Sequence, residues 1–317
     1  MNHDNHTGYN QPAYPEPFSI CNDAVFKAIF TKETPESRTA LRSLLSAFLE
    51  RELSILEVTA NELPINDLRD RQIRFDISVR FNDGEKANVE MTLNPKKHES
   101  LRFEYYTARL FVNQDIRGQN RSYQDLKPAY HLSFLYGNLY PDKEWLHRFV
   151  YYDPERRVKM GGRTEIVTVE LKKLESAVEK AAEELDSREG WALFMMYYRE
   201  DKKTGIIQKI ITMDEGIAAA DQVIRGFTET ELENIAATAK LKFELDAKEE
   251  LHEMRWAAEA KGLEQGRAEG LAKGLEQGRE EAYQEKLQII ASLKELGVST
   301  ETIVQATGLS AEEIEGL

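Results

Sequence analysis

The sequence predicts an α/β (α+β) fold, a mixed sheet flanked by helices with an α-helical C-terminal extension. Residues 73–81 and 87–93 alternate apolar and polar side chains without interruption, a pattern typical of strands with one buried face. Helical patterns lie on both sides of this pair, and later apolar runs have the length of strands. This order of helices, strands, a helix and more strands favours a layered sheet domain.

The first half of the chain contains helices around a three-stranded segment. Asn22 or Asp23 is placed to cap a first helix, and Pro95 ends the strand over 87–93 because proline donates no ladder hydrogen bond. We expect helices from 22 to 30, from 34 to 49 and from 96 to 117, the last ended by Gly118, and strands over 54–60, 73–81 and 87–93.

The second half completes the sheet and then becomes helical. We expect strands over 129–136, 146–152 and 166–171, then helical patterns over 174–200 and 205–283. The predicted organisation is a disordered N-terminus over 1–17, a sheet domain over 18–204, a helical extension over 205–283 and a small helical tail over 284–317.

The charge of the chain is unevenly distributed. The net charge is −14, which argues against a sequence-independent DNA clamp, because phosphate contacts need clustered Lys and Arg. Residues 201–317 hold 14 basic and 24 acidic groups, whereas residues 69–127 hold 12 basic and 9 acidic groups. The segment around the predicted hairpin is therefore locally basic, which is compatible with a phosphate-bearing substrate.

The sequence contains few features that indicate a cellular compartment. The single cysteine, Cys21, cannot form an intramolecular disulfide, so nothing indicates an oxidising compartment. The chain contains no apolar run of signal-peptide type and no stretch of about 18 apolar residues. We expect a cytoplasmic protein with no membrane partner.

The predicted hairpin brings two carboxylates together. Asn82-Asp83-Gly84 supplies residues that tolerate the positive φ of a tight turn. With a three-residue loop, Phe81 faces Glu85 and Asp76 faces Glu90, their Cβ atoms about 5 Å apart. Like charges in this arrangement repel, and a bound divalent cation would reverse the sign of the interaction.

Asp76 and Glu90 therefore predict a metal site. Hard cations such as Mg²⁺ are held by one or two carboxylates together with waters and a substrate phosphate. An ion at this place could activate water for attack on a phosphodiester. The alternative is an ordinary solvated face, whose charges are surface residues without a ligand.

Four segments carry a family resemblance. They are Asn22-Asp23-Ala24-Val25-Phe26-Lys27-Ala28-Ile29-Phe30, Phe75-Asp76-Ile77, Asn88-Val89-Glu90-Met91 and Arg102-Phe103-Glu104-Tyr105-Tyr106. In this order and spacing they resemble the Rpn group of recombination-promoting nucleases, also called PD-(D/E)XK family transposases. The resemblance implies a restriction-endonuclease-like core over 18–204 and metal-dependent DNA cleavage in recombination, transposition or genome defence.

The resemblance also implies roles for individual residues. Asp76 and Glu90 would be metal ligands, with the backbone carbonyl of Met91 completing the site. Asp23 would match the acidic residue of the first helix, either as a third carboxylate or only as a helix cap. The expected cofactor is Mg²⁺, with Mn²⁺ or Ca²⁺ as alternatives.

Thr92 departs from the family pattern. Two residues after the glutamate, the wider superfamily has lysine and the Rpn group usually has glutamine, whereas threonine supplies no positive charge to a transition state. Either another cation substitutes, for which Lys27, Lys96 and Arg74 are the candidates, or the activity is weak, or the site binds DNA without cutting it.

The segment after the hairpin offers nucleic-acid contacts. Lys96 and Lys97 follow the strand of Glu90, and Arg102 and Tyr106 lie four residues apart on one helix face. We expect all four near DNA phosphate. Alternatively, the two lysines are merely solvated, Tyr106 or its neighbour Tyr105 packs against the sheet, and Arg102 pairs with an acid such as Glu99.

The C-terminal third contains a repeat. The sequence Lys-Gly-Leu-Glu-Gln-Gly-Arg occurs at 261–267 and 273–279, and glycines recur at 262, 266, 270, 274 and 278. Each helical glycine costs about 1 kcal/mol relative to alanine, so the spacing indicates either close approach of another helix or a partly helical tether. Residues 284–317 hold two lysines and six glutamates, which favours self-association or partner binding over DNA reading.

These observations leave three hypotheses. The first is a Mg²⁺-dependent DNA endonuclease that forms a homo-oligomer through its C-terminal helices. The second is a nucleic-acid-binding module on the same fold that has lost catalysis, which Thr92 suggests. The third is an assembly protein in which the sheet domain is only a scaffold.

Overall fold

The computed structural model describes residues 18–59, 76–114 and 122–316. The chain forms two compact units, Met1–Phe243 and Glu244–Leu317. The first contains the sheet and the helices around it, and the second contains the later part of helix α7 with two short helices. The domain boundary expected near residue 204 falls inside the first unit.

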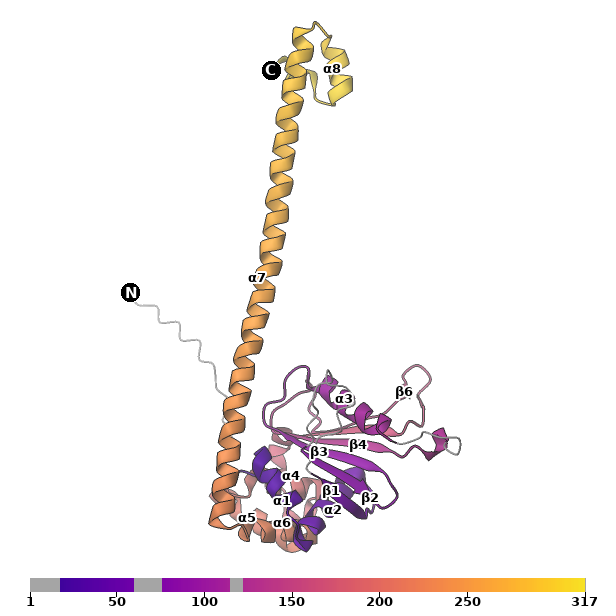
Figure 1. Cartoon of the computed structure of the whole chain (residues 1–317), viewed down its shortest axis with the longest axis vertical. Helices are drawn as coiled ribbons and strands as arrows, with labels where there is room; N and C mark the ends of the chain where they lie inside the picture. Colours follow the sequence, from indigo (N-terminus) through magenta and orange to yellow (C-terminus); the bar gives the residue numbers. More distant parts are fainter. Residues whose placement is uncertain (1–17, 60–75, 115–121, 317) are drawn as a thin grey trace, which may run out of the picture. The chain divides into compact units, whose positions relative to one another are not determined.

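A mixed six-stranded sheet forms the centre of the first unit (Figure 1). Its strand order is β1-β2-β3-β4-β8-β5; β3 runs parallel to β4 and β4 parallel to β8, and the other pairs are antiparallel. The predicted mixed sheet is thus confirmed. The strands are β1 Ile55–Thr59, β2 Ile77–Phe81, β3 Lys86–Thr92, β4 Ala129–Leu135, β5 Leu146–Phe149 and β8 Thr164–Glu170, with β6 Tyr152–Asp153 and β7 Val158–Lys159 in a separate hairpin.

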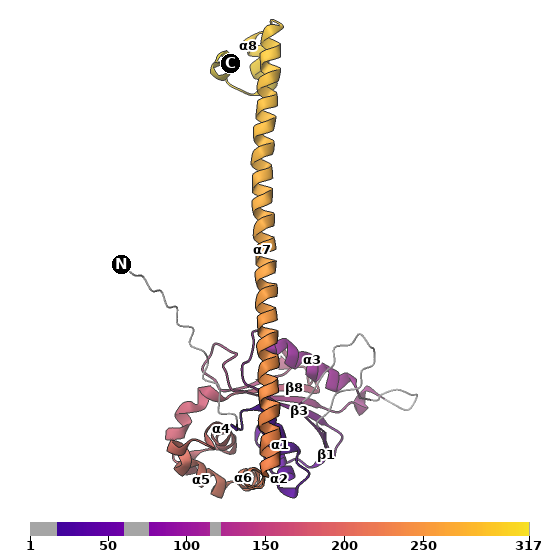
Figure 2. The ribbon, with the colours of Figure 1, turned by 60° about the vertical axis from the view of Figure 1, so that its left-hand side comes forward.

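Helices cover both faces of this sheet (Figures 1 and 2). Helix α3 packs on β3, β4 and β8, whereas α1 and α2 lie on the opposite face with α4, α5 and α6. The helices on the face opposite α3 pack on the sheet through buried aromatic side chains. The ring centroids of Phe48 on α2 and Phe134 on β4, for example, lie 5.0 Å apart. The helices are α1 Asp23–Thr31, α2 Pro35–Leu49, α3 Glu99–Val112, α4 Ser187–Tyr197, α5 Thr204–Met213, α6 Glu215–Arg225 and α7 Glu229–Glu295.

The hairpin has the predicted register. The Phe81 N–H donates to the Glu85 carbonyl at 2.9 Å, across a turn in which Gly84 adopts φ 86°. The pairing continues from Arg80 with Lys86 to Ile77 with Val89. Asp76 immediately precedes β2, and continuing this register by one residue would set it opposite Glu90.

The expectation of one buried face is wrong for β3. Five successive residues, from Ala87 to Met91, are buried, because β3 is an interior strand with a parallel neighbour and α3 covers its second face. The polar side chains on this face are therefore not solvated. Asn88 and Glu90 lie in a buried polar layer that also includes the β4 residues His131 and Ser133.

Several element boundaries differ from the predicted ones. The helix expected over 96–117 begins at Glu99 and ends at Val112, and Gly118 lies outside the described residues, as do residues 73–75. The apolar run over 146–152 divides between β5 and β6. The helical pattern over 174–200 contains 3₁₀ segments (Leu171–Glu179 and Ala182–Glu184) before α4.

The second unit has a small core of its own. The end of α7 packs with α8 (Thr300–Thr307) and α9 (Ala311–Glu315) through buried Ile290, Ile303 and Ile314. Along α7, a Cβ added at any of the five regularly spaced glycines would meet nothing within 4 Å. In the described part of the chain, no helix has the length and apolar character needed to cross a membrane.

Candidate active site

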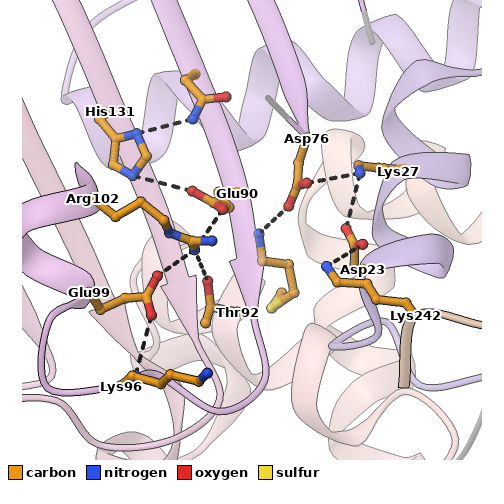
Figure 3. Close-up of polar contacts among 12 residues, drawn as sticks. Asp23, Lys27, Asp76, Glu90, Thr92, Lys96, Glu99, Arg102, His131 and Lys242 are labelled. Atoms are coloured by element: carbon orange, nitrogen blue, oxygen red, sulfur yellow. Dashed lines mark hydrogen bonds and ion pairs between the residues drawn. The ribbon is translucent and has the colours of Figure 1, made fainter. Parts of the chain in front are cut away.

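Three buried carboxylates lie where β2 begins and β3 ends (Figure 3). Asp23 comes from the first turn of α1, Asp76 immediately precedes β2, and Glu90 lies on β3. Their exposed fractions are 7%, 6% and 5%. Since a buried charge is costly unless it is paired, the side chains around these acids determine the chemistry of the site.

Asp76 is held by a lysine and by the backbone. Its Oδ1 lies 2.8 Å from the Lys27 ammonium, and its Oδ2 accepts a hydrogen bond from the Met91 N–H at 3.2 Å. Burial and the nearby Asp23 raise the pKa of Asp76, and Lys27 opposes them. The bond from Met91 fixes the orientation of Asp76 relative to β3, the strand that carries Glu90.

Asp23 is shared by two lysines. Its Oδ1 is 3.4 Å from Lys27 Nζ, one helical turn further along α1, and its Oδ2 is 2.5 Å from Lys242 Nζ on α7. Burial raises the pKa of Asp23, but Lys242 and Lys27 outweigh burial and hold that pKa below its ordinary value. The cap of α1 is Asn22, whose side chain accepts from the Ala24 N–H, so Asp23 contacts lysines instead of capping the helix.

Glu90 faces the guanidinium of Arg102 from α3. Its Oε1 is 2.7 Å from Arg102 Nη2, whereas its buried Oε2 has no hydrogen-bond partner. Burial raises the pKa of Glu90 to about 8; Arg102 opposes this rise, and Asp76 and Glu99 add to it. In this arrangement Glu90 holds its proton at neutral pH unless further positive charge arrives.

Arg102 also joins Thr92 and Glu99 to the site. Its Nη2 is 2.5 Å from Glu99 Oε1 and donates to Thr92 Oγ1 at 3.4 Å. Arg102 therefore pairs with Glu99, as the alternative interpretation of this helix expects, and contacts Glu90 as well. Thr92 itself contributes a hydroxyl at the end of β3 and no charge.

His131 is a site residue that the sequence interpretation missed. Its Nδ1 lies 3.1 Å from Asn88 Nδ2, which is a donor, so the ring hydrogen is on Nε2. That Nε2 is 3.7 Å from Glu90 Oε2. Burial and Arg102 lower the pKa of His131 to about 3, so the ring is neutral and turns an N–H toward Glu90. Only the pairing of β3 with β4 reveals this contact.

The predicted nucleic-acid residues lie around this cluster. Lys97 is exposed, and the Lys96 N–H donates to Glu99 Oε2 at 3.3 Å. Tyr106 packs beside Leu110 and Ala129, with Arg102 above its ring at 5.6 Å, while Tyr105 is 44% exposed. Of the candidate substitutes for Thr92, Lys27 contacts two of the acids, and Arg74 lies outside the described residues.

Asp76 and Glu90 suit a divalent cation. The Oε2 of Glu90 is a buried carboxylate oxygen without a hydrogen-bond partner, and Asp76 supplies a second carboxylate. A cation would give that oxygen a partner. Within the described ranges, no group of three or more His, Cys, Asp or Glu residues could hold a metal. Two carboxylates with waters and a substrate oxygen nevertheless match the way proteins hold Mg²⁺. The Lys27 ammonium provides positive charge at Asp76 in this structure.

Comparison with known proteins identifies the family. Residues 20–254 match the family model described as PD-(D/E)XK nuclease family transposase, and nucleases of this family generally use divalent metal ions. No curated protein and no solved structure matches the chain. The matched range contains the whole sheet and every residue of the acid cluster, and it covers more than half of the chain. The protein therefore belongs to the PD-(D/E)XK nuclease family transposases.

Proposed function

We propose that the protein is a metal-dependent DNA endonuclease whose ion is held by Asp76 and Glu90. Two observations support this most strongly. The hairpin register, continued by one residue, would set Asp76 opposite Glu90, and the buried Oε2 of Glu90 has no hydrogen-bond partner. A bound Mg²⁺ would supply an activated water and would offset charge on the phosphate. A role in recombination, transposition or genome defence is part of the same proposal.

The surrounding residues hold these two acids in place. Met91 orients Asp76 through its N–H, and its carbonyl is the third ligand that we propose. Arg102 faces Oε1 of Glu90 and His131 faces Oε2. Such preorganisation matters because a loosely held ligand loses much of its catalytic effect.

The DNA contacts extend from the site onto α3. We place Lys96, Lys97, Arg102 and Tyr106 along the path of the phosphate backbone, where the local charge of residues 69–127 favours an anion. Arg102 would then join Glu90 to a phosphate oxygen, since a guanidinium has five N–H donors.

We expect Asp76→Asn and Glu90→Gln each to reduce nicking of a supercoiled plasmid at least 100-fold in Mg²⁺ or Mn²⁺, because each removes a carboxylate charge at nearly constant volume. The matched control is Glu104→Gln, which neutralises an exposed carboxylate on the same helix as Arg102 and should cut as the wild type does. Nicking that survives Glu90→Gln, or that persists in EDTA, would remove this site from the account.

We expect the pH dependence of cleavage to shift with metal concentration. The pKa of Glu90 is about 8 without an ion, and only the ionised carboxylate binds a cation, so at low Mg²⁺ the rate should rise toward pH 8. Raising Mg²⁺ favours the ionised form and should move this rise to lower pH. Initial rates over pH 6–9 at several Mg²⁺ concentrations measure the effect. If the cleavage rate rises at the same pH at every Mg²⁺ concentration, the expectation is contradicted.

A second candidate function is DNA binding without cleavage, which the uncharged Thr92 favours. Under the endonuclease proposal, Thr92→Gln should preserve or increase the nicking rate, because glutamine restores a longer polar side chain at the end of β3. A loss of activity would show that the Thr92 hydroxyl, 3.4 Å from Arg102, has its own role. Salt-sensitive DNA retention with no nicking in any divalent metal would support the second candidate.

We also propose that α7 assembles copies of the chain. The five glycines from 262 to 278 are continued at the same four-residue spacing by Ala258 and Ala282, and open space surrounds every one of the glycines. Small residues allow two helix backbones to approach closely, and paired active sites would suit cleavage of both DNA strands.

We expect the double substitution Gly270→Leu and Gly274→Leu to dissociate the assembly, because bulky side chains separate the helices. The matched control, Gly270→Ala and Gly274→Ala, raises helix propensity by about 1 kcal/mol per site and should leave the mass unchanged. Light scattering on the full chain measures the mass. A monomeric wild type, or a leucine variant of wild-type mass, would exclude assembly through this stripe.

A further inference from the structure

The cleavage site needs a cation near the phosphate, and β3 does not provide one. Displacement at phosphorus depends on positive groups that stabilise charge on the phosphate oxygens. The strand ends in Thr92, which is uncharged. In the described part of the chain, the cationic side chains bonded to the three acids are Lys27, Arg102 and Lys242.

Lys27 and Arg102 each form ion pairs with two acids. The Lys27 ammonium lies between Asp76 and Asp23, at 2.8 and 3.4 Å. The Nη2 of Arg102 lies between Glu90 and Glu99, at 2.7 and 2.5 Å. Each of these cations contacts two buried carboxylates. Lys27 therefore stays paired with Asp23 when a metal ion takes its place at Asp76, and Arg102 can add a phosphate contact only while it stays paired with its two acids.

Lys242 is differently placed. It contacts one acid, Asp23, at 2.5 Å, and its side chain is 44% exposed, against 34% for Lys27. An ammonium has three N–H donors, so the contact with Asp23 leaves donors that can face solvent. Asp23 also has Lys27 as a second partner, and the loss of Lys242 from it would not leave that carboxylate uncompensated.

We propose that Lys242 contacts the phosphate group that is cleaved, and that Asp23 positions it there. This inference rests on the proposed endonuclease function. It assigns to α7, a helix outside the sheet, the positive charge that Thr92 does not supply. The ammonium, a compact charge on a flexible four-carbon stem, reaches the site from a position 219 residues away in the chain from Asp23.

Two measurements on the full chain test this role, one of them independent of cleavage. The first is the slope of log affinity against log salt for a short DNA duplex in EDTA. This slope is negative, and loss of one phosphate contact reduces its magnitude by about 1. The second is the single-turnover cleavage rate in Mg²⁺. The variants are Lys242→Gln, Lys242→Arg and Lys240→Gln, the last removing an exposed lysine from the same helix.

We expect Lys242→Gln to reduce the magnitude of the salt slope by about 1 and to reduce the cleavage rate about 100-fold. Lys242→Arg should keep the slope and more of the rate, and Lys240→Gln should match the wild type in both. If Lys242→Gln behaves like Lys240→Gln in both measurements, the inference is overturned. The same holds if the wild type does not bind DNA.

Failure of the endonuclease proposal gives a different result. A wild type that binds DNA but never cuts would remove the catalytic proposal, and the slope would still decide whether Lys242 touches phosphate. Melting midpoints check that the variants fold. Should Lys242→Gln not fold, Asp23→Asn is compared with Asp23→Asn plus Lys242→Gln, which removes both charges; equal salt slopes in that pair overturn the inference.

Discussion

The pairing of β2 with β3 is the constraint on which the site depends. Because the side-chain period of a strand is two, a shift of one residue would send Asp76 and Glu90 to opposite faces of the sheet. The three-residue turn ending at Gly84 fixes the register. Both acids are buried, which is costly without partners. Arg102 of α3 contacts Glu90, and Lys27 of α1 contacts Asp76.

The acid cluster is nearly neutral as a unit. Lys27 pairs with both Asp23 and Asp76, and Lys242 also pairs with Asp23. Glu90 faces Arg102. The partner of each buried charge offsets part of the cost of its burial. Under the proposed function, a divalent ion would compete with Lys27 at Asp76 and would favour the ionised form of Glu90. On the same proposal, the protein would keep an ion-binding pair inside a folded core.

Local patterns predicted most of the sheet and the register of β2 with β3, because strand alternation and turn chemistry depend on neighbouring residues. They could not show that the second face of β3 is buried, since that depends on β4 and α3. His131 and Lys242 were missed for the same reason. Neither has a sequence signal near Glu90 or Asp23, and both reach the site only through tertiary packing. Thr92, by contrast, is singled out by its chemistry in the sequence alone, and its role stays a prediction.

The central claim is that Asp76 and Glu90 share an ion. A crystal structure of the full chain grown with Mn²⁺ tests it most directly, through the anomalous scattering of the metal. We expect a single strong peak bonded to oxygens of Asp76 and Glu90, with the Lys27 ammonium moved away from Asp76 but still paired with Asp23. A map without a peak there at saturating Mn²⁺, with Lys27 still bonded to Asp76, would contradict it.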